Sequence, residues 1–200
     1  MEAATRQRPI EGDKAARIVD AMRSSVARRG VAGATFDHVA REARVSRGLL
    51  HYYFGTKERL LAEVVRRDCD VRMHVIDERL AGARSGDEVI DGLVASLAEM
   101  VENDPPFITL VFELFALSRR NADIAAEFAE LLRRTREHVA GLLEAKERAG
   151  VLRLHAPAGA VADVLFAMVD GVAMRMLTER DRDFGESLQA GVRAVRALID

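Results

Sequence analysis

The stretch RVSRGLLHYYFGTKERLL, residues 44–61, gathers the side chains of this sequence that are best suited to binding chemistry. A guanidinium, an imidazole and two phenols follow one another closely, at Arg47, His51, Tyr52 and Tyr53. All four groups can donate hydrogen bonds, and an arginine can bind either a phosphate or the edge of a guanine base. Gly48 stands among them, and a glycine lets the backbone approach another surface closely. The stretch therefore favours recognition of a polyanion over catalysis.

Common catalytic motifs are missing from the sequence. Two weaker possibilities, a metal site and a redox-sensing cysteine, stay open. The five histidines form no HExxH pair, and there is no GxSxG, Walker or GxGxxG motif. Asp70, His74 and Asp77 could hold a metal on one helix, but a solvated helix face has the same spacing. Cys69, the single cysteine, could sense oxidation, but it has no resolving thiol. We expect no catalytic residue, no metal and no cofactor.

The composition is that of a chain that can bury a core and stay soluble. It has 200 residues, of which 49 % are apolar and 31 % charged, and this suits one domain or a small domain joined to a larger one. A single cysteine excludes a disulfide framework and indicates a reducing compartment. The sequence has no run of about 18 apolar residues and no apolar signal core, so we expect a cytoplasmic protein with no membrane partner.

Charge is divided unevenly along the chain, although the net charge is only −2. Residues 1–60 hold 12 Lys and Arg against 7 Asp and Glu, whereas the remainder holds 18 against 25. A basic N-terminal part suggests a polyanionic partner for that part alone. Uneven surface charge without such a partner explains the same counts, so charge by itself leaves both interpretations open.

The elements that must position these side chains are helices, because apolar residues recur at helical spacing and strand patterns are nearly absent. A first helix should end at Gly30 in the left-handed conformation, Thr35 should cap a second and Ser46 a third. Thr56 should cap a long fourth helix over roughly 56–80. Further helices are predicted over 87–103, 106–118, 122–149, 157–179 and 183–199. The predicted fold class is all-α, with about nine helices.

The second and third helices are too short to be stable alone, and a turn around Arg44 joins them in a helix-turn-helix arrangement. A projection at about 100° per residue divides the third helix into two arcs. The outward arc holds Arg47, Gly48, His51 and Tyr52, and the inward arc holds Leu49, Leu50, Tyr53 and Phe54. The outward arc suits a helix that reads a DNA groove. A helical bundle with an ordinary polar face and no DNA partner is the alternative.

Residues 35–60, TFDHVAREARVSRGLLHYYFGTKERL, resemble the DNA-binding domain of TetR-family transcriptional regulators. The matching features are Gly30, Thr35, Ala40, Ala43, Val45-Ser46, Gly48, the Tyr-Tyr-Phe run and Lys57-Glu58. The resemblance is strong over roughly 12–65 and extends to the remainder mainly through its all-helical layout. It implies a helix-turn-helix DNA-binding domain at 1–56 and a larger helical effector-binding and dimerisation domain at 57–200.

The resemblance assigns DNA contacts to Thr35, Arg44, Ser46, Arg47, Gly48, His51, Tyr52, Thr56 and Lys57. Helix starts, Tyr52 and Lys57 should meet the phosphate backbone of double-stranded operator DNA. Arg47 could read a guanine through two hydrogen bonds or hold only a phosphate. Arg44 faces either a phosphate or solvent. His51 departs from the tyrosine that is frequent in the family, so a base contact there stays open.

The resemblance also implies a homodimeric regulator, by family default a repressor, on a near-palindromic operator. Its recognition helices would enter successive major grooves about 34–36 Å apart. The predicted helices over 157–179 and 183–199 are the expected dimer surface. The last one carries an apolar stripe at Phe184, Leu188, Val192, Val195 and Ile199, and Gly191 is a small residue that permits close helix approach. Half of this stripe would serve equally well as core within one chain.

The larger domain of the family binds a small molecule that favours a conformation unfit for DNA. We expect a hydrophobic or aromatic effector near Met100, Phe107, Phe112, Glu113, Phe166, Asp170 and Met174, although the apolar members would also suit a core. The segment 106–118 is apolar on nearly every face and should be buried. Glu113 within it then needs an arginine partner, a position at an edge or a ligand.

Overall fold

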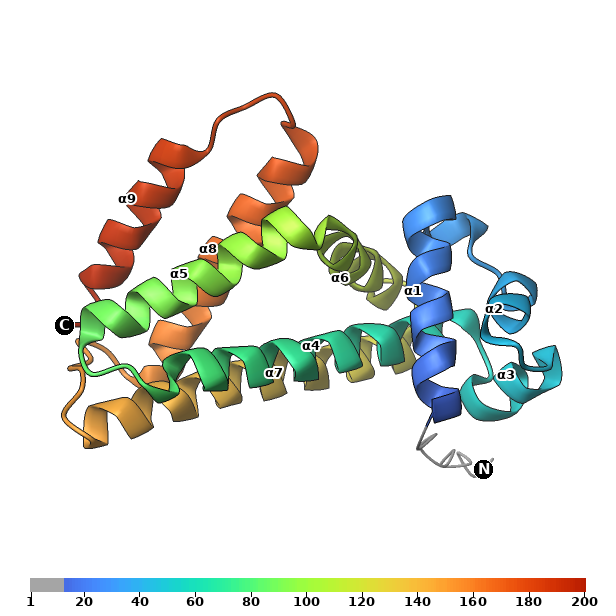
Figure 1. Cartoon of the computed structure of the whole chain (residues 1–200), viewed down its shortest axis with the longest axis horizontal. Helices are drawn as coiled ribbons and strands as arrows, with labels where there is room; N and C mark the ends of the chain where they lie inside the picture. Colours follow the sequence, from blue (N-terminus) through green and yellow to red (C-terminus); the bar gives the residue numbers. More distant parts are fainter. Residues whose placement is uncertain (1–12) are drawn as a thin grey trace. The chain divides into compact units, whose positions relative to one another are not determined.

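The structure, a computed structural model, describes residues 13–200 apart from the side chain of Glu102. Figure 1 draws the helices of this part of the chain. They are α1 (Asp13–Gly33), α2 (Phe36–Ala43), α3 (Arg47–Phe54), α4 (Lys57–Ala81), α5 (Gly86–Asn103), α6 (Pro105–Ser118), α7 (Ala122–Arg148), α8 (Ala158–Thr178) and α9 (Gly185–Arg196). The predicted all-α fold is confirmed. None of the described helices is long and apolar enough to cross a membrane.

Hydroxyl side chains start three of these helices, as the sequence predicts. Thr35, Ser46 and Thr56 stand directly before α2, α3 and α4. Each hydroxyl oxygen accepts a hydrogen bond from the amide three residues later, at 3.4, 3.2 and 3.2 Å respectively. Such a bond satisfies one of the backbone donors that a helix start leaves without an intrahelical partner. The starts of α2 and α3 are thereby fixed by local chemistry.

The NDPP segment separates α5 from α6. Helix α5 ends at Asn103, and α6 begins at Pro105, a position where proline's missing N–H is no loss. The carboxylate of Asp104 accepts a hydrogen bond from the amide of Phe107 at 3.3 Å and so caps the new helix. The break that the predicted helices over 87–103 and 106–118 leave between them is confirmed.

Gly30 interrupts α1 without ending it. Its φ of 69° and ψ of 169° are non-helical, and helical structure continues to Gly33. The positive φ agrees with the prediction for this glycine, but the ψ lies outside the left-handed helical region, in a region that essentially only glycine occupies. The predicted left-handed helix end at Gly30 is therefore wrong in detail: the chain kinks there.

The chain forms two compact units. One contains the described residues of Met1–Arg67 together with Leu110–Phe128, and the other contains Asp68–Thr109 together with Ala129–Asp200. Both units are assembled from separate stretches of sequence, because α4, α6 and α7 each contribute to both. The predicted domain boundary after residue 56 stays a prediction.

In the first unit, α1 packs against α2, and α2 packs against α3. Its most deeply buried side chains include Ile18, Met22, Val39, Leu50, Leu60, Leu61, Leu110, Leu114 and Ile124. The start of α4 is also tied to α7 within this unit, because Arg59 lies 2.9 Å from a carboxylate oxygen of Asp123. Burial of these apolar side chains is the main stabilisation of the short helices α2 and α3.

In the second unit, α9 packs against α5 and α8. The core contains Leu80, Val89, Ile90, Val139, Leu143, Leu152, Ala158, Val161, Ala162, Val195 and Ile199. The last residues join it through an isolated antiparallel bridge between Leu154 and Ile199. Reciprocal backbone hydrogen bonds of 2.8 and 2.9 Å between Arg153 and Asp200 flank that bridge.

Helix α6 is less buried than its composition suggests. Ile108 and Leu114 are buried, but Thr109, Glu113 and Phe115 are exposed, and Phe115 keeps 53 % of its surface accessible. The prediction that the whole segment is buried is therefore wrong. Because Glu113 lies on an exposed side of its helix, its carboxylate stays hydrated and needs no buried partner.

Candidate nucleic-acid interface

The turn between α2 and α3 fixes how the third helix is presented. Arg44 adopts the left-handed conformation, with φ 55° and ψ 47°. The amide of Val45 donates to the carbonyl of Ala40 at 2.9 Å, and that of Arg44 donates to Arg41 at 3.3 Å. These two bonds form a Schellman motif, in which glycine is the usual residue at the position of Arg44. The turn is therefore sharp and leaves the Arg44 side chain exposed.

Helix α3 has the two arcs that the sequence predicts. Arg47, Gly48, His51 and Tyr52 are exposed, and Tyr52 keeps 70 % of its surface accessible. On the other arc, Leu50 and Phe54 are buried, and Leu49 and Tyr53 are partly buried. The Tyr52 and Tyr53 rings meet edge to face with centroids 5.0 Å apart. An outward row of hydrogen-bond donors is thus presented by a helix whose other side is anchored in the core.

Arg47 is held by two neighbours on this surface. Its Nη1 lies 3.3 Å from both carboxylate oxygens of Asp37, in the first turn of α2. Its Nε donates to Nε2 of His51 at 3.3 Å. The His51 ring also meets Phe36 edge to face, with centroids 4.8 Å apart. Asp37 is absent from the sequence-based assignment, because no helical spacing connects it with Arg47; only the turn brings them together.

Gly48 leaves open space at the start of α3. It is exposed, and a side-chain carbon at this position would lie 4.0 Å from Oγ of Ser46. That distance is an ordinary van der Waals contact, so the protein's own packing does not require glycine here. The absence of a side chain instead lets another molecule come close to the backbone.

Lys57 has an internal partner. Its Nζ donates to the backbone carbonyl of Val31 at 2.9 Å, which connects the start of α4 with the end of α1. Thr56 and Thr35 are exposed at their helix starts, where a phosphate could approach. The predicted DNA contacts of these three residues and of Ser46 stay predictions.

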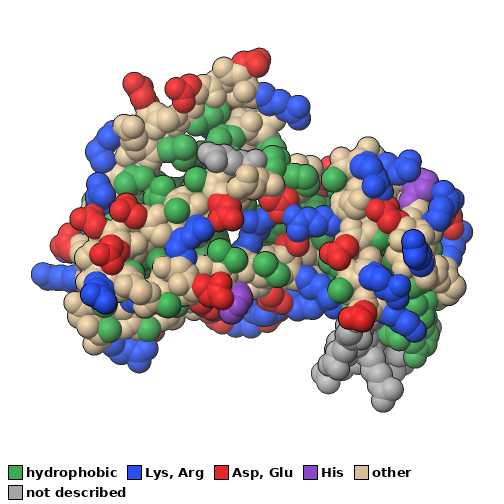
Figure 2. Space-filling model, in the orientation of Figure 1, with side chains coloured by type: hydrophobic (Ala, Val, Ile, Leu, Met, Phe, Trp, Pro, Cys, Tyr) green, Lys and Arg blue, Asp and Glu red, His purple; other side chains and the backbone are tan. Residues whose placement is uncertain are grey.

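Basic side chains surround this surface. Figure 2 shows Lys and Arg side chains gathered over the part of the molecule formed by α1, α2 and α3. The exposed ones include Arg28, Arg29, Arg41, Arg44 and Arg47. Some acidic partners lie among them, since Arg28 forms an ion pair with Glu42. A basic surface around a helix-turn-helix suits the phosphate backbone of a nucleic acid.

Two family profiles match the chain. The profile of bacterial regulatory proteins of the tetR family matches residues 18–64, and that of the C-terminal part of BetI-type transcriptional repressors matches residues 87–200. This chain belongs to the TetR family. The family consists of DNA-binding transcriptional regulators, and this confirms the prediction that the chain is not an enzyme.

Relatives of this TetR-family regulator cover most of its length. An HTH-type transcriptional repressor of Streptomyces coelicolor is 30 % identical over 77 % of this chain and 73 % of its own length. A TetR transcription regulator of Haloarcula marismortui has the same fold, with a TM-score of 0.75, 19 % identity and coverage of 94 % of this chain and 99 % of its own. A transcriptional regulator of Saccharomonospora viridis, solved in complex with choline, has a TM-score of 0.69 and 20 % identity over 93 % and 97 % of the two chains.

The residues predicted for the dimer interface of this TetR-family regulator are divided between core and surface. Phe184 and Val195 keep only 5 % and 7 % of their surface accessible within the single chain, so they have little left to offer a partner. Gly191 permits an intramolecular approach, because a side-chain carbon there would lie 3.1 Å from Cε of Met168. Leu188 and Val192 are partly buried.

The residues predicted for the effector pocket are similarly dispersed. Phe107 is buried, with the guanidinium of Arg72 4.0 Å from its ring centroid. Asp170 and Met174 are exposed on α8, and partial desolvation by neighbouring atoms raises the pKa of the Asp170 carboxyl. Met100, Phe112 and Phe166 are partly buried. Phe112 and Glu113 belong to the unit that contains α3, whereas the other predicted pocket residues belong to the second unit.

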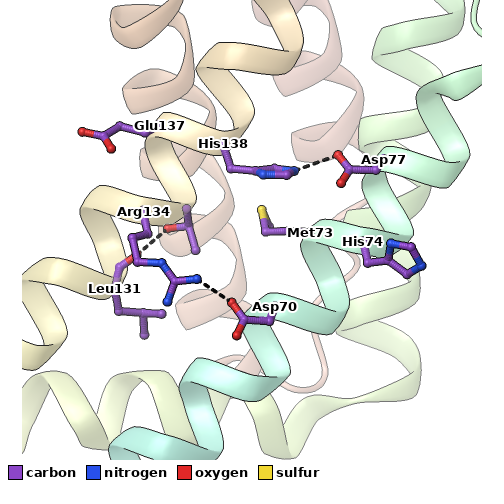
Figure 3. A pocket seen from close by; sticks show the side chains of 9 residues that line it. Asp70, Met73, His74, Asp77, Leu131, Arg134, Glu137 and His138 are labelled. Carbon is purple, nitrogen blue, oxygen red and sulfur yellow. Dashed lines mark hydrogen bonds and ion pairs between the residues drawn. The ribbon is translucent and has the colours of Figure 1, made fainter.

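A pocket of about 490 Å³ lies between α4 and α7 in the second unit. Figure 3 shows the side chains that line it. The pocket is lined by Asp70, Met73, His74, Asp77, Leu131, Arg134, Thr135, Glu137 and His138, none of which belongs to the predicted pocket. Two pairs cross it: Arg134 lies 3.0 Å from Asp70, and Nε2 of His138 lies 2.7 Å from Asp77 (Figure 3). In the sequence, Asp70, His74 and Asp77 stand out only as possible metal ligands on one helix face, and helical spacing does not show that α7 forms the other wall of a pocket.

Asp70, His74 and Asp77, the possible metal ligands, each contact another side chain, and Cys69 is partly buried. Asp70 and Asp77 contact Arg134 and His138, and Nε2 of His74 lies 3.3 Å from Glu78. In the part of the chain that the structure describes, no three His, Cys, Asp or Glu side chains are placed to hold one metal ion. Burial raises the pKa of Cys69 to about 12, with Asp68 adding to the shift, so its thiol is protonated at neutral pH.

Proposed function

We propose that this TetR-family protein is a homodimeric repressor that reads a near-palindromic operator through α3 and is released by a small molecule. The observation that supports DNA reading best is the exposed arc of Arg47, Gly48, His51 and Tyr52 on a helix capped by Ser46. Such an arc offers a base-edge donor at Arg47, a phosphate donor at Tyr52 and a close backbone approach at Gly48. The match of residues 87–200 to the profile of BetI-type repressors supports repression rather than activation.

The test of DNA reading is selection of duplexes from a random pool by the purified full-length chain, followed by affinity measurements. Arg47→Ala and Tyr52→Ala should each weaken binding to the selected duplex. Arg148→Ala, which removes an exposed arginine in the last turn of α7, is the matched control. The logarithm of affinity should fall steeply with the logarithm of salt concentration. A chain that enriches no sequence, or variants that bind as the wild type does, would overturn the proposal.

We assign dimerisation to the exposed faces of α8 and α9. Val164, Ala167 and Met174 recur at helical spacing on α8 and are exposed, and Val164 and Met174 keep 42 % and 52 % of their surface accessible. On α9, Ala190 and Ala194 are exposed small residues. An apolar face with small residues suits close packing of helices from a second copy, because a symmetric interface pairs the same patch on both chains.

Sedimentation equilibrium of the wild type and of Val164→Glu tests the dimer. The wild type should have twice the mass of the chain, and the variant should dissociate at concentrations where the wild type does not. Arg153→Glu, an exposed change outside both helices, is a control for added negative charge. A monomeric wild type, or a variant as dimeric as the wild type, would refute this assignment.

For the effector we propose a hydrophobic or aromatic small molecule bound by the second unit. Several apolar side chains there are only partly buried against the core, including Val94, Leu165, Phe166 and Met168. These leave apolar surface that a ligand could cover. The relative from Saccharomonospora viridis was solved with choline, a small cation, so choline is the informative comparison compound. A thermal-shift series should favour aromatic or acyl compounds over choline, and a larger shift with choline would contradict the proposed class.

A further inference from the structure

Arg47, the residue best placed to read a base, is not a freely moving side chain in the DNA-free protein. Its Nη1 is shared between the two carboxylate oxygens of Asp37, both 3.3 Å away, and its Nε donates to His51 at 3.3 Å. Arg47 and Asp37 keep 60 % and 58 % of their side-chain surface accessible, and exposed ion pairs of this kind contribute little to stability. The pair therefore contributes little to holding α2 to α3, and its main effect is on where the Arg47 guanidinium lies.

His51 is itself fixed in an orientation that accepts a hydrogen bond. Its Nδ1 lies 3.3 Å from the backbone carbonyl oxygen of Gly55, and its ring meets the Phe36 ring edge to face. A carbonyl can only accept, so Nδ1 carries the proton and Nε2 presents its lone pair to Arg47. The imidazole thus uses its acceptor on Arg47 and has no second ring nitrogen left to read a base.

The guanidinium is consequently restricted in two ways. Two of its nitrogens are directed at Asp37 and His51, whereas Nη2 has no acceptor among the described residues. The free N–H groups of a guanidinium oriented in this way suit the O6 and N7 acceptors of guanine. The Asp37 carboxylate also repels a phosphate, which would otherwise attract a mobile arginine on this surface.

We propose that Asp37 and His51 are positioning residues that make Arg47 a guanine reader rather than a phosphate clamp. This inference rests on the proposed DNA-reading function of α3. It also accounts for the histidine at position 51: the ring supports Arg47 and does not contact a base itself. The affected quantity is the specificity ratio, which is the affinity for the selected operator divided by the affinity for random duplex of equal length.

The experiment measures both affinities at one salt concentration by fluorescence anisotropy, with the full-length chain and the operator obtained by selection. Asp37→Asn should lower the specificity ratio roughly tenfold, while binding to random duplex is kept or strengthened. His51→Phe keeps a ring beside Phe36 but removes the acceptor, and should lower the ratio similarly. His51→Gln, whose amide oxygen can again accept from Arg47, should restore part of it. Arg47→Ala should show the loss expected when guanine reading is absent.

Glu42→Gln is the matched control, because it removes one carboxylate from α2 and disturbs the ion pair with Arg28 instead. It should strengthen binding to both duplexes alike and leave the ratio as it is. The inference is overturned if Asp37→Asn and His51→Phe keep the wild-type ratio, or if Arg47→Ala keeps it. A wild type that selects no sequence at all would instead refute the proposed DNA-reading function, so the two failures are distinguishable.

Discussion

Oγ of Ser46 lies 4.0 Å from the point where a side chain of Gly48 would begin. The protein's own atoms therefore accept a methyl group at Gly48, and alanine also has the higher helix propensity. We predict that Gly48→Ala raises the free energy of unfolding by up to about 1 kcal/mol. Its operator affinity should nevertheless fall roughly tenfold or more, because one disturbed base-pair contact costs about 1–3 kcal/mol.

Denaturant unfolding and anisotropy titrations of the same preparation separate these two effects. Gly141→Ala is a suitable control, because Gly141 also has open space around its missing side chain but lies on α7. It should gain stability without losing DNA affinity. If Gly48→Ala bound the operator as tightly as the wild type, close approach of the backbone to DNA at this position would be excluded.

Tyr52 should contribute to the affinity for DNA without contributing to sequence specificity. Its ring is largely exposed, and a phenol hydroxyl that meets a phosphate carries no information about sequence. Tyr52→Phe should therefore weaken binding to operator and random duplex by the same factor, roughly fivefold for a hydrogen bond of about 1 kcal/mol. Tyr53→Phe, at a partly buried position, provides the comparison. A change in the specificity ratio of Tyr52→Phe would show that this hydroxyl contacts a base instead.

Cys69 should be inert in the folded protein. Burial is the largest cause of its raised pKa of about 12, so at pH 8 the reactive thiolate is rare. We predict that iodoacetamide labels the native chain on the order of a thousandfold more slowly than the chain in denaturant, from the difference in thiolate fraction. The denatured protein is its own control, since the chain has one cysteine. Rapid native labelling would restore the redox-sensor interpretation.

Asp170 should make stability depend on pH in a defined direction. Desolvation raises its pKa above the ordinary 3.8, which means that the fold disfavours the charged carboxylate. Below the unfolded-state pKa the carboxyl is protonated in both states, so Asp170 does not lower the free energy of unfolding. As pH rises through the folded-state pKa, the folded protein must carry the disfavoured charge and this stability is lost. Asp170→Asn should therefore raise the Tm at pH 7 relative to the wild type, and the difference should shrink towards about pH 3.

Asp163→Asn on the same helix is the comparison for that measurement. Its carboxylate is exposed and lies 3.7 Å from Nε of Arg136, so neutralising it should not raise the Tm. Equal behaviour of the two variants at pH 7 would mean that the surroundings of Asp170 do not disfavour its charge.

Local signals predicted much of the fold and of the DNA-reading surface. Hydroxyl caps at Thr35 and Ser46, the break before Pro105 and the two arcs of α3 depend on neighbours within a few residues, and the structure has all of them. Asp37 escaped prediction because its contact with Arg47 depends on the turn between two helices. Periodicity carries no information about a pairing of that kind.

The apolar stripes were weaker predictors of the dimer interface and of burial, for a related reason. Periodicity tells which face of a helix avoids water, but it does not tell whether that face meets its own chain or another. Phe184 and Val195 are core residues of the single chain, although their spacing fits a dimer interface equally well. The exposed side of α6 was hidden in the same way, because Phe115 is as apolar as the buried Leu114 beside it.

The unit that carries α3 is discontinuous in sequence, and this limits how such regulators can exchange parts. Its compact body includes Leu110–Phe128, and Asp123 from that stretch meets Arg59 near the start of α4. A chimera that joins residues 13–67 to the C-terminal part of another regulator would lose the packing of Leu110–Phe128 and the contact between Asp123 and Arg59. Grafting the DNA-reading surface onto another regulator should therefore work better when Leu110–Phe128 is transferred as well. The transferable module thus consists of two segments that are separated in the sequence.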